Sequence, residues 1–163
     1  MSELATLRPA LPAAQTSETD GIPHNIEAEQ QLLGALLTNN EVFDKISAIL
    51  GPDHFFDPVH RHIYEIAIAR IQKNALASPV TLKGYLEDDI GLKELGGPAY
   101  LARIAGAAIS AFAARDYAQM IYDLAVRREL IQLGRDISAR AALVEVSSEP
   151  KEQIVEAEQR LYK

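Results

Sequence analysis

The sequence predicts an all-α protein: a compact helical head over residues 23–108, followed by a long antiparallel helical hairpin over residues 109–163. The main observation is a run from 111 to 143 that has no proline, has a single glycine (Gly134) and is rich in residues that favour helix. Shorter apolar segments with helical spacing precede it, separated by Gly, Pro and Asn. No segment predicts a strand.

The chain begins with residues 1–22, which contain two prolines and a polar stretch without periodicity, so we expect a disordered tail. A short peptide that binds a partner is the alternative for this segment. The first helix is expected to begin after Asn25, a good N-cap, with Glu27 and Glu29 in the first turn, where negative charge favours the helix dipole. We expect it to end at Asn39.

The head continues with a helix over residues 41–50, which the following Gly-Pro pair ends. Asp57 is expected to cap the next helix, with Pro58 at its first position and an end near Lys73. A further helix is expected to begin at Thr81, a suitable N-cap residue. These caps divide the head into short helices.

The last part of the head is a single turn between Gly91 and Gly96, followed by a helix from Pro98. After the long helix, residues 144–148 are expected to turn, and Pro150 opens the return helix of the hairpin. The sequence stops in the middle of this helical pattern without a cap, so we expect a fragment of a longer protein.

The long helix has apolar residues on two opposed sides, counted at about 100° per residue. One side holds Tyr117, Met120, Ile121, Leu124 and Ile131, and the other holds Val126, Leu130, Leu133 and Ile137. We expect the chain itself to cover one side and a second subunit to cover the other. The predicted oligomer or partner interface comprises Tyr117, Ile121, Leu124, Val126, Leu130, Ile131, Leu133, Ile137, Ile154 and Leu161.

Five arginines alternate with Asp and Glu along the same helix. The simplest interpretation is a solvent-exposed face with salt bridges. A recognition surface is the alternative, because arginines beside spare apolar positions are typical of protein interfaces. On that interpretation the residues that contact a partner are Arg127, Arg128 and Arg135.

Composition excludes several classes of protein. The net charge is −7, and non-specific DNA binding relies on an excess of Lys and Arg, so any role with nucleic acid is expected to be indirect. There is no cysteine to form disulfides or ligate zinc, and no apolar run approaches the roughly 20 residues of a membrane span. We expect a cytoplasmic protein without membrane contact.

No motif for catalysis or for a cofactor is present: the nine glycines form neither common phosphate-binding loop. A metal-dependent hydrolase that uses His54, His60 and His62 is the weakest alternative. Residues two apart on a helix project about 200° apart, so packing and capping are favoured for His60 and His62. The acidic run 87–89 is interpreted as a solvated helix end. We therefore predict no catalytic, cofactor or metal site.

Four segments, in this order and spacing, resemble a known family. They are PHNIEAEQ with LGALL (23–30 and 33–37), FFDPVHRHIY (55–64), PVTL with LGGPAYL (79–82 and 95–101), and Tyr117-Ala118, Ile121, RELI (128–131) and Ile137 of the long helix. Together they resemble the N-terminal domain of the bacterial replicative hexameric DNA helicase of the DnaB type. Residues 157–159 (AEQ) resemble the start of that family's linker, so the resemblance covers about residues 22–163.

The resemblance implies a domain without catalysis that forms the collar of a hexamer. Helical hairpins would pair into dimers, and three dimers would make the ring. The collar would dock primase, and a helicase loader is a further partner. ATP, magnesium and DNA would be handled by a RecA-like motor that follows a linker absent here and unwinds DNA in the 5′-3′ direction. A free-standing helical dimerisation adaptor or regulator is the alternative function.

Overall fold

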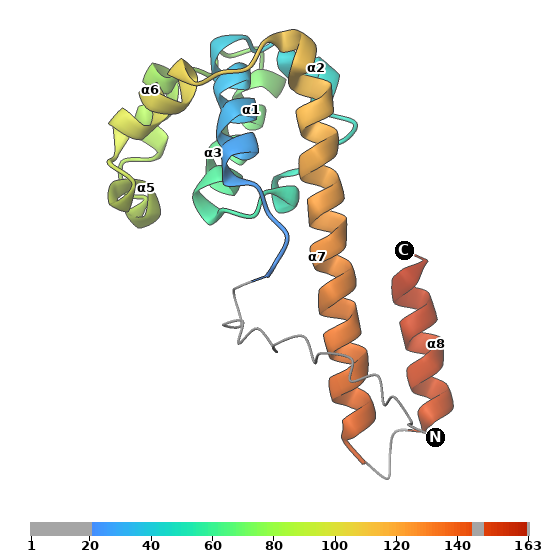
Figure 1. Ribbon diagram of the computed structural model, residues 1–163. Coiled ribbons are helices and arrows are strands. Elements are labelled where there is room, and N and C mark those ends of the chain that lie inside the picture. The colour runs from blue at the N-terminus through green and yellow to red at the C-terminus, as the bar shows by residue number, and fades with distance from the viewer. Residues whose placement is uncertain (1–20, 145–148, 163) are drawn as a thin grey trace, which may run out of the picture.

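The computed structural model describes residues 21–144 and 149–162, and these form helices without a strand (Figure 1). Almost all of the predicted tail and of the predicted turn at 144–148 therefore lies outside the described residues. The helices are α1 (Ile26–Thr38), α2 (Val42–Ile46), α3 (Pro58–Gln72), α4 (Pro79–Leu82), α5 (Ile90–Glu94), α6 (Pro98–Gly106), α7 (Ala114–Ala142) and α8 (Pro150–Leu161). Short 3-10 turns lie at η1 (Pro52–His54), η2 (Lys83–Tyr85) and η3 (Ala111–Ala113).

Two of the predicted caps are confirmed. The Asn25 side chain accepts a hydrogen bond from the backbone N–H of Ala28 at 3.0 Å. The Asp57 carboxylate accepts one from the N–H of Val59 at 2.7 Å, and Pro58 is the first residue of α3. Each cap satisfies a backbone donor that the first helical turn leaves free.

Three predicted boundaries are wrong. The helix expected over 41–50 is regular only from Val42 to Ile46, and the long helix begins three residues later than expected because Ala111–Ala113 form a 3-10 turn. Thr81 does not cap α4; Ser78 does, and the two residues form a reciprocal capping box. The reason is Pro79, which suits the first helical position and lacks an N–H, so the cap is the residue before it.

The core of the head is built around α1, which lies between α6 and α7 (Figure 1). Its buried residues meet Ile63 of α3 and Leu101 of α6 in one apolar cluster. Gly34 allows α1 and α6 to touch, since a Cβ atom there would lie 2.0 Å from the carbonyl oxygen of Ile104. The head thus has a tightly packed centre from which α7 departs.

A buried polar network joins three of these elements. Glu29 and His60 are both fully buried, and Nδ1 of His60 lies 2.9 Å from Oε1 of Glu29. Nε2 of His60 lies 2.6 Å from the Tyr100 hydroxyl oxygen, and Glu29 also accepts from the N–H of Phe56 at 2.8 Å. These contacts satisfy polar groups that would be costly to bury unpaired.

The remaining histidine and acidic predictions have a mixed outcome. His60 packs in the core, as expected, and His62 points elsewhere, with Nδ1 2.6 Å from Oδ2 of Asp89. The interpretation of 87–89 as a merely solvated end is wrong for Asp89, because its carboxylate caps α5 through the N–H of Leu92 at 2.8 Å. Both hydrogen bonds hold the pKa of the Asp89 carboxylate below its ordinary value, and the one from the N–H of Leu92 has the larger effect.

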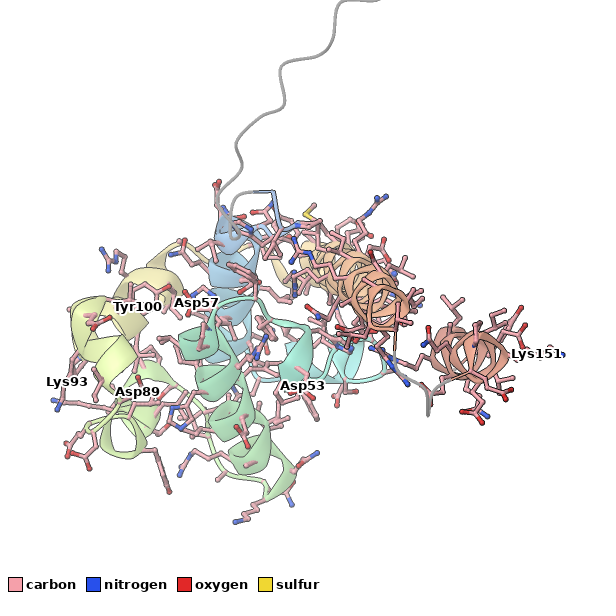
Figure 2. The ribbon with its side chains drawn as sticks, turned by 90° about the horizontal axis from the view of Figure 1, so that it is seen from below. Asp53, Asp57, Asp89, Lys93, Tyr100 and Lys151 are labelled. Atoms are coloured by element: carbon pink, nitrogen blue, oxygen red, sulfur yellow. The ribbon has the colours of Figure 1, made fainter. Side chains whose placement is uncertain are left out.

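Beyond the head, α7 continues as a rod and α8 returns antiparallel beside its second half (Figure 1). Seen from below, α8 lies on the side of α7 away from the head (Figure 2). Within the described ranges, no helix combines the length and the apolar character that a membrane span requires. The predicted architecture of a head followed by a helical hairpin is confirmed.

Candidate interface on the helical hairpin

The first half of α7 is anchored to the head by a narrow stripe. Its buried residues are Ala114, Ala118, Ile121 and Ala125, spaced four, three and four apart, which places them on one side of a helix. Three of the four are alanines, so the backbone of α7 comes close to α1 and α2. Ile121 is only 1% exposed, so the structure contradicts its place in the predicted interface. Alanine adds little to an apolar pattern, and the sequence prediction therefore misses this stripe.

Tyr117, another predicted interface residue, is half-buried and packs against the core of the head. Leu124 and Ile131 are half-buried as well, whereas Met120 of the same predicted side is exposed. The side that the chain covers is therefore rotated from the predicted one toward the alanine stripe.

The second half of α7 leaves apolar side chains uncovered. Past Ala125, Leu133 is the one residue of α7 that the structure shows as buried, and Val126 is half-buried. Leu130 is 53% exposed and Ile137 is 41% exposed, and on α8 Ile154 is 59% and Leu161 54% exposed. We call Val126, Leu130, Ile137, Ile154 and Leu161 the hairpin apolar strip.

The strip runs along the seam between the two helices. Val126, Leu130 and Leu161 line one groove of about 430 Å³, with Leu133 in its floor. Residues seven apart lie on nearly the same face of a helix, so Ile137 follows Leu130 and Ile154 follows Leu161 along the hairpin. Glu129, Gln132 and Arg160 line the same groove. An apolar centre with a polar rim is the usual composition of a protein interface.

Ion pairs also link α7 and α8 elsewhere along the seam. A terminal nitrogen of Arg160 lies 2.9 Å from Oδ2 of Asp136, and Arg140 pairs with Glu156. The hydrogen bond from Arg160, and then that from Gln132, lowers the pKa of Asp136. All four charged side chains are well exposed, so these pairs contribute little to stability. They close the hairpin without covering the apolar strip.

The three predicted arginines do not share one surface. Arg127 and Arg135 are exposed, whereas Arg128 is half-buried and turned into its own chain. Its terminal nitrogens donate to the carbonyl oxygens of Pro23 and His54, each at 2.8 Å. The partner contact predicted for Arg128 is therefore replaced by contacts within the subunit. The spacing contained a signal for this, because Arg128 continues the buried stripe three residues after Ala125.

Sequence reasoning also missed the aromatic contacts beside Arg128. The guanidinium carbon of Arg128 lies 5.4 Å from the centre of the Phe56 ring, and His24 stacks on the same ring at 4.2 Å. Among the described residues, no three His, Asp or Glu side chains gather as metal ligands do. The exposed apolar strip with its polar rim is the feature of the described chain that suits binding to another protein surface.

Comparison with known proteins places the chain beside one family. The family model described as the DnaB-like helicase N-terminal domain matches residues 21–123. The replicative DNA helicase DnaB of Rickettsia typhi is 40% identical over 141 residues, which are 86% of this chain and 28% of that protein. The corresponding protein of Synechocystis is 30% identical over 86% of this chain and 16% of its own length. The chain thus spans little more than a quarter of the length of the Rickettsia relative and about a sixth of that of the Synechocystis relative.

Two solved structures have a similar fold. The N-terminal domain of DnaB helicase from Mycobacterium tuberculosis aligns with a TM-score of 0.78 at 24% identity, over 86% of this chain and 97% of that one. A DnaB-like replicative helicase, described together with its interactions with primase, aligns with a TM-score of 0.66 at 25% identity, over 85% of this chain and 31% of that one. In both, the similarity extends beyond the head into the hairpin, because the head alone is a smaller share of the chain.

Proposed function

The chain belongs to the family of DnaB-like helicase N-terminal domains, and from this premise we propose that it acts as a collar module of a replicative helicase. In this role it assembles with copies of itself through the hairpin apolar strip and carries no catalytic step. The first product of assembly is a dimer of hairpins, and three such dimers complete a hexameric ring.

The observation that carries this proposal is the exposure of Leu130, Ile137, Ile154 and Leu161 along one seam of a rod that leaves the head. Soluble monomers rarely expose a contiguous apolar patch rimmed by polar residues unless another protein covers it. A second copy supplies the same strip, and a two-fold arrangement places each strip against its equivalent. The strip therefore suits pairing with itself.

Primase is the partner that we propose for the assembled collar. One of the similar solved structures is described together with its interactions with primase, and the family assignment makes an equivalent contact a reasonable expectation here. Of the three predicted partner-contact arginines, Arg127 and Arg135 are exposed on α7 and so can reach such a partner. A helicase loader is a further proposed partner.

The remaining activities are proposed for the complete replicative helicase and not for these residues. ATP and magnesium binding, contact with DNA and 5′-3′ unwinding would belong to a RecA-like motor that the collar organises into a ring. The collar itself needs no cofactor in this scheme and would meet DNA only through the assembled ring. Such a protein works in the cytoplasm, where the bacterial chromosome is replicated.

A free-standing dimerisation adaptor would use the same hairpin, so the coding sequence downstream of residue 163 separates the two functions. A RecA-like domain with a phosphate-binding loop supports the collar function, and a stop codon at that point would leave the adaptor.

Native mass spectrometry of the chain, alone and with the C-terminal domain of the cognate primase, tests the proposal directly. We expect a dimer or larger assembly alone, with association that depends weakly on salt because the strip is apolar. We expect added mass with the primase domain. A strict monomer at high concentration would remove the physical basis for a collar.

A further inference from the structure

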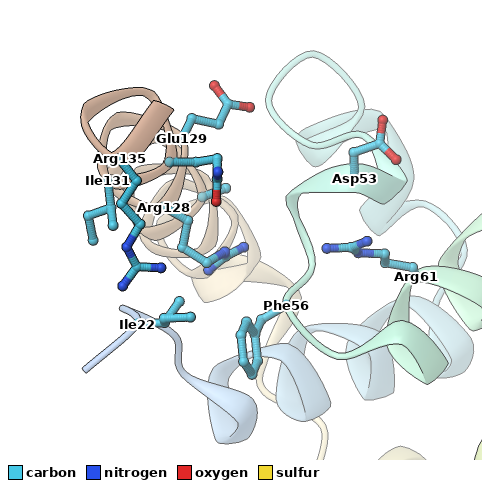
Figure 3. Close-up of a pocket in the computed structure, with 10 residues that line it drawn as sticks. Ile22, Asp53, Phe56, Arg61, Arg128, Glu129, Ile131 and Arg135 are labelled. Carbon is cyan, nitrogen blue, oxygen red and sulfur yellow. The ribbon is translucent and has the colours of Figure 1, made fainter. Parts of the chain in front are cut away.

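A second concave site lies on the chain, in the angle between α7 and the head. It is a pocket of about 330 Å³ whose lining includes Arg61, Arg128 and Arg135, with apolar walls from Ile22 and Ile131 (Figure 3). Three guanidinium groups around one hollow are unexpected in a chain whose net charge is −7. Self-association of the proposed collar through the hairpin apolar strip makes no use of this pocket, although Arg135 is also an arginine proposed to reach primase.

Two of the arginines are held in place before any ligand arrives. Nε of Arg61 donates to the carbonyl oxygen of Phe55 at 2.6 Å, while Arg128 is held by the carbonyl oxygens of Pro23 and His54. The terminal amino groups of Arg61 form no hydrogen bond to any described residue, and neither does the guanidinium of Arg135. Groups that are already fixed lose little entropy when they bind.

None of the three arginines in the pocket is neutralised by an ion pair with a carboxylate of the described residues. Figure 3 shows Arg61 reaching from the head and Arg128 from α7 toward the backbone segment that carries Phe56. Asp53 and Glu129 also line the pocket. Among the described residues, however, no carboxylate forms an ion pair within 4.0 Å with any of the three arginines. Three arginines that outnumber the two carboxylates of the pocket, and form no ion pair with them, favour binding of an anion there.

We propose that this pocket binds the phosphate group of a small molecule, with a nucleotide as the class of ligand that fits it. A phosphate carries up to two charges and offers several acceptor oxygens, so it can accept from more than one arginine, whereas one arginine can satisfy both oxygens of a carboxylate. The volume is at the lower end of small-molecule sites, and Ile22 and Ile131 offer apolar contact to the remainder of the ligand.

A nucleic-acid strand is a poorer fit than a small phosphate. The acidic side chains of Asp53 and Glu129 border the three arginines, and the rest of the chain is acidic as well. A strand would bring many phosphates against that surface, while a nucleotide brings its charge only to the pocket.

The test is an NMR titration of the 163-residue chain with pyrophosphate, ADP, sodium glutamate and a short single-stranded DNA. We expect saturable binding of pyrophosphate or ADP with shifts at the backbone amides of Phe56, Arg61 and Ile131. ADP that binds more tightly than pyrophosphate identifies a nucleotide site, and equal affinities identify a site for the phosphate alone. Both results support the phosphate pocket.

The variants Arg61→Gln and Arg135→Gln should each weaken pyrophosphate binding about tenfold, the usual effect of losing one hydrogen-bonded charge. Arg127→Gln is the matched control: it removes the same charge from an exposed position on α7 that does not line the pocket, and it should change affinity less than about twofold. Arg135 has no partner among the described residues, so Arg135→Gln should fold normally and keep the test valid if Arg61→Gln does not.

Three results would overturn the proposal. They are an absence of saturable binding up to about 10 mM pyrophosphate, an equal loss of affinity in the Arg127 control, and glutamate or DNA that binds at least as tightly as pyrophosphate and ADP. The self-association of the hairpin is a separate measurement on the same samples, so either proposal can fail without the other.

Discussion

Leu130 offers the sharpest test of the hairpin interface. It lies at the centre of the groove between α7 and α8, and 53% of it is exposed in the single chain. Full burial of a leucine side chain stabilises by about 1.5–3 kcal/mol, so covering the exposed half is worth about 1 kcal/mol. In a two-fold interface the residue counts twice, so Leu130→Ala should cost about 2 kcal/mol and weaken dimerisation about tenfold to thirtyfold.

Replacement by aspartate should have a larger effect. Leu130→Asp or Ile137→Asp places an unpaired charge in the interface of each copy, and burial of such a charge costs several kcal/mol, so both variants should shift toward monomer. Ser138→Asp is the control, because this substitution adds the same charge to the same helix at an exposed polar position outside the strip. The monomer should stay folded, since both replaced side chains are already largely in solvent.

The assay is sedimentation velocity or light scattering over a range of concentrations, with circular dichroism as a check on helix content. The reasoning predicts a lower mass for the strip variants at a concentration where Ser138→Asp still has the mass of the unmodified chain. An unchanged mass for both Leu130→Asp and Ile137→Asp would show that the strip is not where copies meet.

Three further predictions concern the fold. Gly34→Ala should destabilise the head by about 3 kcal/mol or more, measured by urea denaturation, because its Cβ atom would collide with the carbonyl oxygen of Ile104; an unchanged midpoint would argue against the close helix contact. Burial raises the pKa of Tyr64 from 10.0 to about 12. The buried neutral phenol therefore stabilises the folded state fully below pH 10, and this stabilisation is lost as the pH rises toward 12. Alkaline unfolding in that window should be smaller in Tyr64→Phe. The hydrogen bond from Arg160 lowers the pKa of Asp136 from 3.8. The ionised carboxylate therefore stabilises the hairpin above about pH 4, and this stabilisation is lost as the pH falls through the lowered pKa. The protection of the α8 amides against hydrogen exchange, expressed relative to the intrinsic exchange rate at each pH, should therefore fall on acidification below that pH, and Asp136→Asn should remove this loss of protection.

Local signals carried the sequence prediction of the fold. Asn25 and Asp57 cap helices through backbone groups two or three residues away, so a short stretch of sequence contains all that the cap requires. Glu29 is the opposite case. The sequence predicts a first-turn acid, yet its carboxylate is buried against His60, whose position is 31 residues further along the chain. Burial and partners at that separation depend on how helices pack, and helical periodicity does not reveal them.

The candidate site was predictable to the same limited extent. Leu130 and Ile137 follow helical spacing, so the sequence was sufficient to place them on one uncovered side of α7. Arg128 lies only two residues before Leu130 and has a different role, because it holds the segments around Pro23 and His54. Its charge is typical of a surface residue, and its hydrogen-bond acceptors are backbone carbonyl oxygens, which every residue has and no sequence pattern identifies. The anion pocket could not be predicted for the same reason.

The continuity of α7 has a mechanical consequence. The head holds the helix as far as Arg128, and the helix then extends for roughly 20 Å at 1.5 Å per residue, so it behaves as a lever whose fulcrum lies at the head. A tilt of about 5° at that fulcrum would displace the far end by about 2 Å, given this length. A force applied at the tip of the hairpin would thus be transmitted to α1 and α2. Small changes in alanine packing would set the angle between α7 and the head, and so the orientation of the heads in the proposed ring.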